Sequence, residues 1–133
     1  MATVSGDSKV TGTVTFTQKA LGHPVIVSGT IKGLDANAQR GFHVQCASSS
    51  LPSSPPQCSR PDCVFRSALG DLSSGCVSAG PHFNPFNENH GAPGDMHRHA
   101  GDFGNILSNG DGVAEFSFED KVISLNGPLS VVG

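Results

Sequence analysis

The chain has 133 residues, of which 36% are hydrophobic and 14% charged, and its formal net charge is −3. This length suits one domain, residues 1–133, with a real core. The balance of charge argues against nucleic-acid binding, which needs a basic stripe. No apolar run approaches about 18 residues and no apolar signal region is visible at the N-terminus, so we expect a cytoplasmic protein without a membrane span.

Several stretches alternate between apolar and polar residues with the period of a β-strand. In the first, TGTVTFTQ, Gly12, Val14 and Phe16 lie on one face and threonines on the other. The turn cluster NGDG at 109–112 is of a kind that joins hairpin strands. The strands predicted in this way span residues 11–18, 24–34, 40–45, 102–107 and 113–119.

No stretch shows a convincing helical period. Many short strands separated by Gly- and Pro-containing turns indicate an all-β chain folded as an antiparallel sandwich or barrel.

One segment, residues 46–69, has no period and is rich in Ser, Pro and Cys. Such a composition does not bury enough apolar surface to offset the entropy of ordering, so we predict a disordered insert. It contains Cys46, Cys58 and Cys63, while Cys76 follows later. Four thiols allow three complete pairings, and the sequence does not choose among them.

The segment 80–106 holds four of the six histidines. His82, His90, His99 and Asp102 have the spacing H-x7-H-x8-H-x2-D, and three imidazoles with one carboxylate make a closed four-coordinate zinc set. Prolines and glycines between them exclude a helix or long strand, so turns must assemble the donors and the loop must form together with its site. The alternative is a His-rich surface loop without a metal.

Two further histidines, His97 and His23, have no expected metal role. His97, two residues before His99, is expected to be a solvated loop residue, and His23, before Pro24, an exposed turn residue.

Long motifs carry a resemblance to a known family. GPHFNP, HGAP and RHAGDFGNI, together with RGFHV at 40–44, GDLSSGCVSAG at 70–80 and the final DGVAEFSFEDKVISLNGPLSVVG, resemble the copper/zinc superoxide dismutase family. The resemblance implies a Greek-key antiparallel β-barrel or sandwich, with a zinc loop at 76–102 crossing outside between the fourth and fifth strands. The insert at 46–69 departs from the family pattern. So does the C-terminus, where further strands are missing and the barrel is expected to be incomplete.

The resemblance also implies two metals. It assigns zinc to the set of His82, His90, His99 and Asp102. It assigns copper, and the catalytic roles, to His43 and to His82 as the bridging imidazole. Gln45 stands where a second copper histidine is expected, and an amide oxygen is a poor ligand for Cu(I). The fourth histidine has no counterpart before the end of the chain, so we expect a partial copper site with weak or lost copper.

The activity implied is dismutation of superoxide to oxygen and hydrogen peroxide, with turnover of this exact chain far below that of the family. The alternative function is a non-catalytic zinc-binding domain of the same family, acting as a structural or partner-binding module; a third is a plain structural β-domain without metal. The partners expected are superoxide and a second copy, or another chain that completes the barrel.

The resemblance further implies two ties to the rest of the fold. Arg98 and Asp120 match a pair that fastens the zinc loop to the barrel, for which the alternative is two solvated charges. Cys76 matches a cysteine whose family partner lies near the C-terminus and is absent from this chain.

Overall fold

The computed structural model describes residues 1–4, 9–45, 81–127 and 129–132. In these residues all regular secondary structure is β, so no helix there could span a membrane. The predicted insert 46–69 and all four cysteines lie outside the described residues. The strands are β1 (Ala2–Val4), β2 (Thr11–Gln18), β3 (Val25–Lys32), β4 (Gln39–His43), β5 (Asp102–Leu107) and β6 (Ala114–Asp120).

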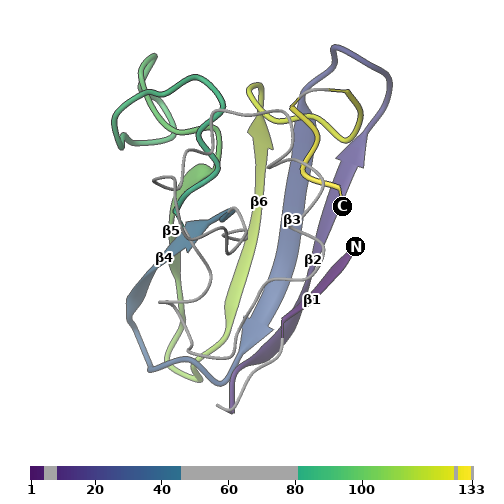
Figure 1. The fold of residues 1–133 in the computed structure, drawn as a ribbon. Coiled ribbons are helices and arrows are strands. Elements are labelled where there is room, and N and C mark those ends of the chain that lie inside the picture. Colours follow the sequence, from purple (N-terminus) through teal and green to yellow (C-terminus); the bar gives the residue numbers. More distant parts are fainter. Residues whose placement is uncertain (5–8, 46–80, 128, 133) are drawn as a thin grey trace, which may run out of the picture.

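These strands form two antiparallel sheets. The first has the order β1-β2-β3-β6, and the second pairs β4 with β5. Figure 1 shows the β4–β5 pair beside the β6 side of the larger sheet, with residues 81–101, which lead into β5, above it. The all-β antiparallel sandwich is therefore confirmed, and the described strands leave it open rather than closed into a barrel.

The alternation in the sequence predicts which side of each strand is buried. In β2, Val14 is buried and the threonines are exposed; in β3, Val25, Val27 and Ile31 are buried. The predicted strand from residue 24 begins one residue later, because Pro24 has no N–H for the ladder. The strand β1 was not predicted, since three residues are too few to show alternation.

Phenylalanine rings join the two sheets. The ring of Phe42, on β4, lies 5.6 Å from that of Phe103 on β5, and 5.0 and 6.4 Å from those of Phe116 and Phe118 on β6, measured between centroids. Each such pair is worth about 0.5–1.5 kcal/mol beyond its buried area. Because neighbouring residues of a strand face opposite sides, the inward Phe42 turns His43 away from the core.

Residues 81–101, here called the metal-binding loop because they carry His82, His90 and His99, lead into β5. The register of β4 against β5 changes close to this loop. Gly41 pairs with Asn105, but His43 pairs with Asp102 instead of the next residue in register. Such bulges re-aim side chains and are frequent beside functional sites. Here the bulge sets His43 opposite Asp102.

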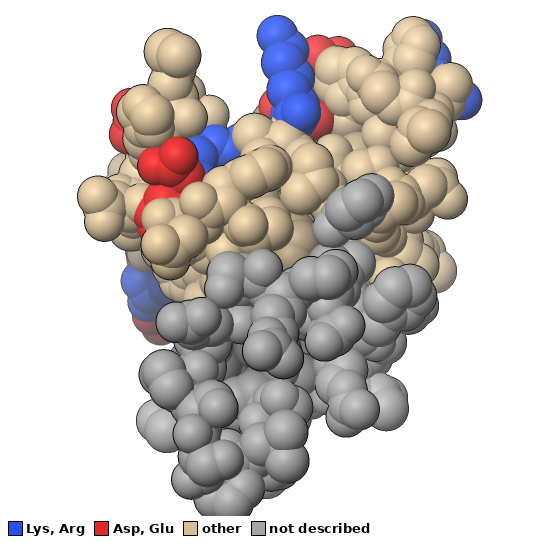
Figure 2. Space-filling view, turned by 45° about the horizontal axis from the view of Figure 1, so that its top comes forward, with Lys and Arg blue, Asp and Glu red and all other residues tan. Residues whose placement is uncertain are grey.

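Charged residues form no broad patch on the face shown in Figure 2. Basic and acidic side chains lie scattered among uncharged residues on the described part of that face.

Candidate metal centre

A ring of three backbone hydrogen bonds closes the base of the metal-binding loop. The N–H of Val44 donates to the carbonyl of Gly101 (2.9 Å), that of Phe83 to Val44 (2.8 Å), and that of Gly101 to Phe83 (2.9 Å). A Cβ on residue 101 would lie 2.3 Å from the Val44 oxygen, so only glycine permits this approach. The ring holds both ends of the loop against the end of β4.

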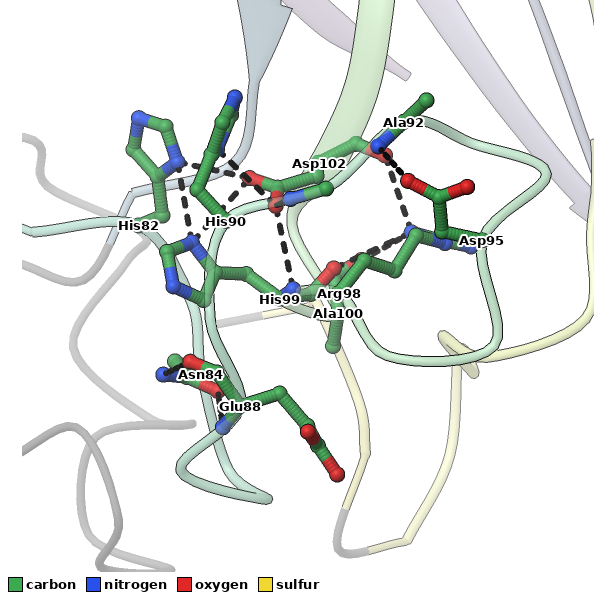
Figure 3. A network of polar contacts seen from close by, with 11 residues as sticks. His82, Asn84, Glu88, His90, Ala92, Asp95, Arg98, His99, Ala100 and Asp102 are labelled. Carbon is green, nitrogen blue, oxygen red and sulfur yellow. Dashed lines mark hydrogen bonds and ion pairs between the residues drawn. The ribbon is translucent and has the colours of Figure 1, made fainter.

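The carboxylate of Asp102 is the centre of the site. Figure 3 shows three imidazole rings around it, from His82, His90 and His99. All three present Nδ1: those of His82 and His99 lie 2.7 and 3.3 Å from Oδ1, and that of His90 lies 3.1 Å from Oδ2. Oδ2 also accepts the backbone N–H groups of Gly91 and His99, both at 3.1 Å. The structure thus brings the four residues of the predicted zinc set together.

The spacing of these donors suits a tetrahedral metal ion. Ligands 2.0–2.1 Å from zinc at tetrahedral corners are about 3.3–3.4 Å apart. The Nδ1 atoms of His82 and His99 are 3.3 Å apart, and His99 Nδ1 is 3.3 Å from Asp102 Oδ1. The shorter His82–Asp102 distance of 2.7 Å is a hydrogen bond whose proton a bound metal would replace. The residues present therefore fit zinc in number, type and arrangement.

His43 joins the same cluster. Its ring is stacked on that of His82, with centroids 4.2 Å apart and planes 19° apart. One ligand atom from each of His43, His82, His90 and Asp102 can be chosen so that all four lie within 4.8 Å of one another. The family resemblance implies a copper role alone for His43, whereas the structure brings its ring close to the predicted zinc donors.

The electrostatic environment favours the ligand form of these groups. Burial, followed by the nearby His82, lowers the pKa of the His43 imidazole, and the attraction of Asp102 offsets this only in part. Burial alone would raise the pKa of Asp102, but hydrogen bonds from the Gly91 N–H, His82 and the His99 N–H bring it below its usual value. A neutral imidazole and an ionised carboxylate are the states that bind metals.

The loop is fastened to β6 by a buried ion pair. Arg98 Nη2 lies 2.5 Å from Asp120 Oδ2, and both residues are buried, at 6% and 4% exposed. The other guanidinium nitrogen of Arg98, Nη1, donates to the carbonyl of Asp102 at 2.9 Å. The alternative of two solvated charges is therefore wrong. The ion pair holds Arg98 in place, and Arg98 in turn binds the backbone of the donor Asp102.

Two further supports of the loop, from Asn84 and Gly101, were not predicted from the sequence. The side chain of Asn84 binds the backbone of Glu88 twice, donating to its carbonyl at 2.8 Å and accepting from its N–H at 2.9 Å. The Asn-Pro pair that begins this turn was a usable signal. The role of Gly101 was not visible, because the Val44 carbonyl that it approaches lies far away in the sequence.

The remaining sequence expectations concern His97, His23 and Gln45. His97 and His23 are exposed, as predicted, and His97 Nδ1 lies 3.1 Å from Glu88 Oε2. Gln45 pairs with His82 in an isolated antiparallel bridge. The imidazole that stacks on the ring of His82 is that of His43.

Comparisons with known proteins identify the family. A family model described as copper/zinc superoxide dismutase matches residues 10–133. The chain is 45% identical over 130 residues to a superoxide dismutase [Cu-Zn] of Cryptococcus neoformans var. grubii, covering 98% of this chain and 70% of the relative. It is 44% identical to those of Yarrowia lipolytica and Saccharomyces cerevisiae, in each case covering all of this chain and 72% of the relative. The chain belongs to the copper/zinc superoxide dismutase family.

Proposed function

We propose that this protein is a superoxide dismutase that holds zinc at His82, His90, His99 and Asp102 and a redox-active copper ion at His43 and His82. The reaction converts two superoxide anions and two protons into one oxygen and one hydrogen peroxide molecule. The observation that carries the proposal is the convergence of three Nδ1 atoms on one buried carboxylate, with His43 stacked on the ring of His82.

The two ring nitrogens of His82 have different roles in this proposal. Its Nδ1 faces Asp102 at 2.7 Å, so its Nε2 is left for a second ion or for a proton. Copper, when bound, supplies the one-electron redox couple. Asp102 orients the ring of His82, and the lowered pKa of His43 keeps that imidazole in its ligand form. His82 Nε2 is thus the atom at which the chain can hold a proton for the peroxide product.

A second candidate is the non-catalytic zinc-binding module. It is favoured by Gln45, which stands where the resemblance calls for a copper histidine, and two imidazoles bind copper less firmly than four. In the described residues, β4 pairs with β5 along one edge only. For such a module we propose that a partner binds by adding a strand to the other edge of β4. The partner is a second copy of this chain or another protein. The cytoplasmic location stays a prediction.

Metal content and turnover separate the two candidates. The purified chain is loaded with zinc and copper and desalted, both metals are counted per chain by mass spectrometry, and superoxide decay is followed. One zinc, one copper and fast decay support the dismutase. One zinc without copper favours the zinc module, and a chain without either metal contradicts both. The variant Asp102→Asn, which removes the central carboxylate charge, is expected to lose zinc and serves as the control.

A further inference from the structure

The cluster holds five donor residues, although a tetrahedral ion takes four. We infer that His43 and His99 are alternative fourth ligands of one ion held by His82, His90 and Asp102. This inference rests on the proposed zinc site and extends it, since it gives His43 a role in holding the first metal.

The distances support two overlapping sets. The set with His99 has two separations of 3.3 Å, close to a tetrahedral edge. The set with His43 has all four ligand atoms within 4.8 Å of one another, so no pair of its donors must close by more than about 1.5 Å to reach the tetrahedral edge of about 3.3 Å. The His90 side chain is 61% exposed, so it can move to complete either set.

The two competing imidazoles are held differently. The backbone of His99 is fixed, because its N–H donates to Asp102 Oδ2 at 3.1 Å and its carbonyl accepts from Arg98 at 3.1 Å. The ring of His43 lies over Gly41, where a Cβ would come within 2.7 Å of its Cε1 atom. His43 thus reaches the cluster only because residue 41 has no side chain, and His99 is the better anchored ligand.

Because His43 can serve only one ion, binding of the first ion with His43 and binding of a second ion beside His82 exclude each other. An ion held with His43 uses the imidazole that a second ion beside His82 needs. An ion held with His99 leaves His43 available. His99 therefore controls whether a second metal is bound, although the proposed copper set does not include it.

Cobalt(II) tests the inference, because tetrahedral Co2+ has strong visible absorption bands and substitutes for zinc. The metal-free wild type, His99→Ala, His43→Ala and the double variant are titrated with Co2+. His97→Ala, which removes an exposed histidine of the same loop, is the matched control. We expect tetrahedral binding in His99→Ala, weaker than in the wild type by roughly ten- to a hundredfold, the range typical of perturbed metal sites. We expect the double variant to bind Co2+ more weakly than His99→Ala, because water must then supply the fourth ligand. We expect wild-type behaviour in His97→Ala.

The opposite results overturn the inference. Loss of the tetrahedral bands in His99→Ala shows that His43 does not replace His99, and equal binding by His99→Ala and the double variant shows that His43 is no ligand. Circular dichroism confirms the fold of each variant, and His99→Asn replaces His99→Ala if the latter unfolds. A wild type without tetrahedral Co2+ contradicts the proposed zinc site itself, so the two failures are distinguishable.

Discussion

Arg98 in the metal-binding loop and Asp120 at the end of β6 form a buried ion pair, with Arg98 Nη2 2.5 Å from Asp120 Oδ2. The same carboxylate accepts the backbone N–H groups of Val122 and Ile123 at 2.8 and 2.9 Å. One side chain thus orders both the loop behind the metal donors and the segment that follows β6.

Replacing Asp120 by Asn is expected to destabilise the protein by about 3–5 kcal/mol, because it leaves the buried guanidinium without its counter-charge. Urea unfolding followed by circular dichroism measures the change. Asp111→Asn, an exposed position in a turn, is the matched control and is expected to stay within about 0.5 kcal/mol of the wild type. Equal stabilities of the two variants would show that the pair contributes nothing.

Replacing Gly101 by Ala is expected to open the base of the metal-binding loop. The new Cβ would lie 2.3 Å from the Val44 oxygen and 3.1 Å from the Phe83 nitrogen, so the ring of backbone hydrogen bonds must break or shift. Overpacking of this kind costs about 1–3 kcal/mol, and zinc affinity is expected to fall with it. Thermal unfolding and zinc titration measure both effects.

The control for this change is Gly94→Ala, in the same loop. A Cβ there would meet no atom within 4 Å, so stability and zinc affinity are expected to be unchanged. A Gly101→Ala protein that matches this control in both measurements would contradict the closure of the loop by the backbone ring.

The strands and the metal donors could be predicted from the sequence, but the position of His43 could not. Val14 and Val27 reveal their strands because period-two alternation is local. The donors His82, His90 and Asp102 were identified by a spacing that turns bring together, and the structure places them in contact. The stacking of His43 on His82 was not predictable, because it depends on a bulge between β4 and β5 that leaves no local pattern.

Replacing Gly41 by Ala is expected to move His43 without touching the zinc donors. The added Cβ would lie 2.7 Å from His43 Cε1, so the ring must shift from its stack on His82. Misplacing a reacting group by about 1 Å can lower turnover about a hundredfold. We expect a fall of that order in dismutase activity, with binding of the first zinc ion by the His99 set retained.

Superoxide decay and zinc titration separate these two effects. Gly110→Ala, in a turn where a Cβ would meet no atom within 4 Å, is the control and is expected to keep both properties. Unchanged decay in Gly41→Ala would show that the position of His43 does not limit the reaction.

The metal-free protein is expected to lose stability as the pH falls below about 6.5. The pKa of His43 is lowered on folding by burial and by the neighbouring His82, so the unfolded chain binds the proton first and acid favours unfolding. The lowered pKa of Asp102 acts in the same direction at lower pH. Its contribution to stability is present above the unfolded value of 3.8 and is lost as the pH drops through the folded value.

Urea unfolding at a series of pH values from 7.5 to 5, in the presence of a chelator, measures the slope attributable to His43. His43→Gln is expected to flatten this slope, because glutamine does not titrate. His97→Gln, an exposed histidine of the same loop, is the matched control. An equally steep slope in His43→Gln and in the wild type would place the titrating group elsewhere.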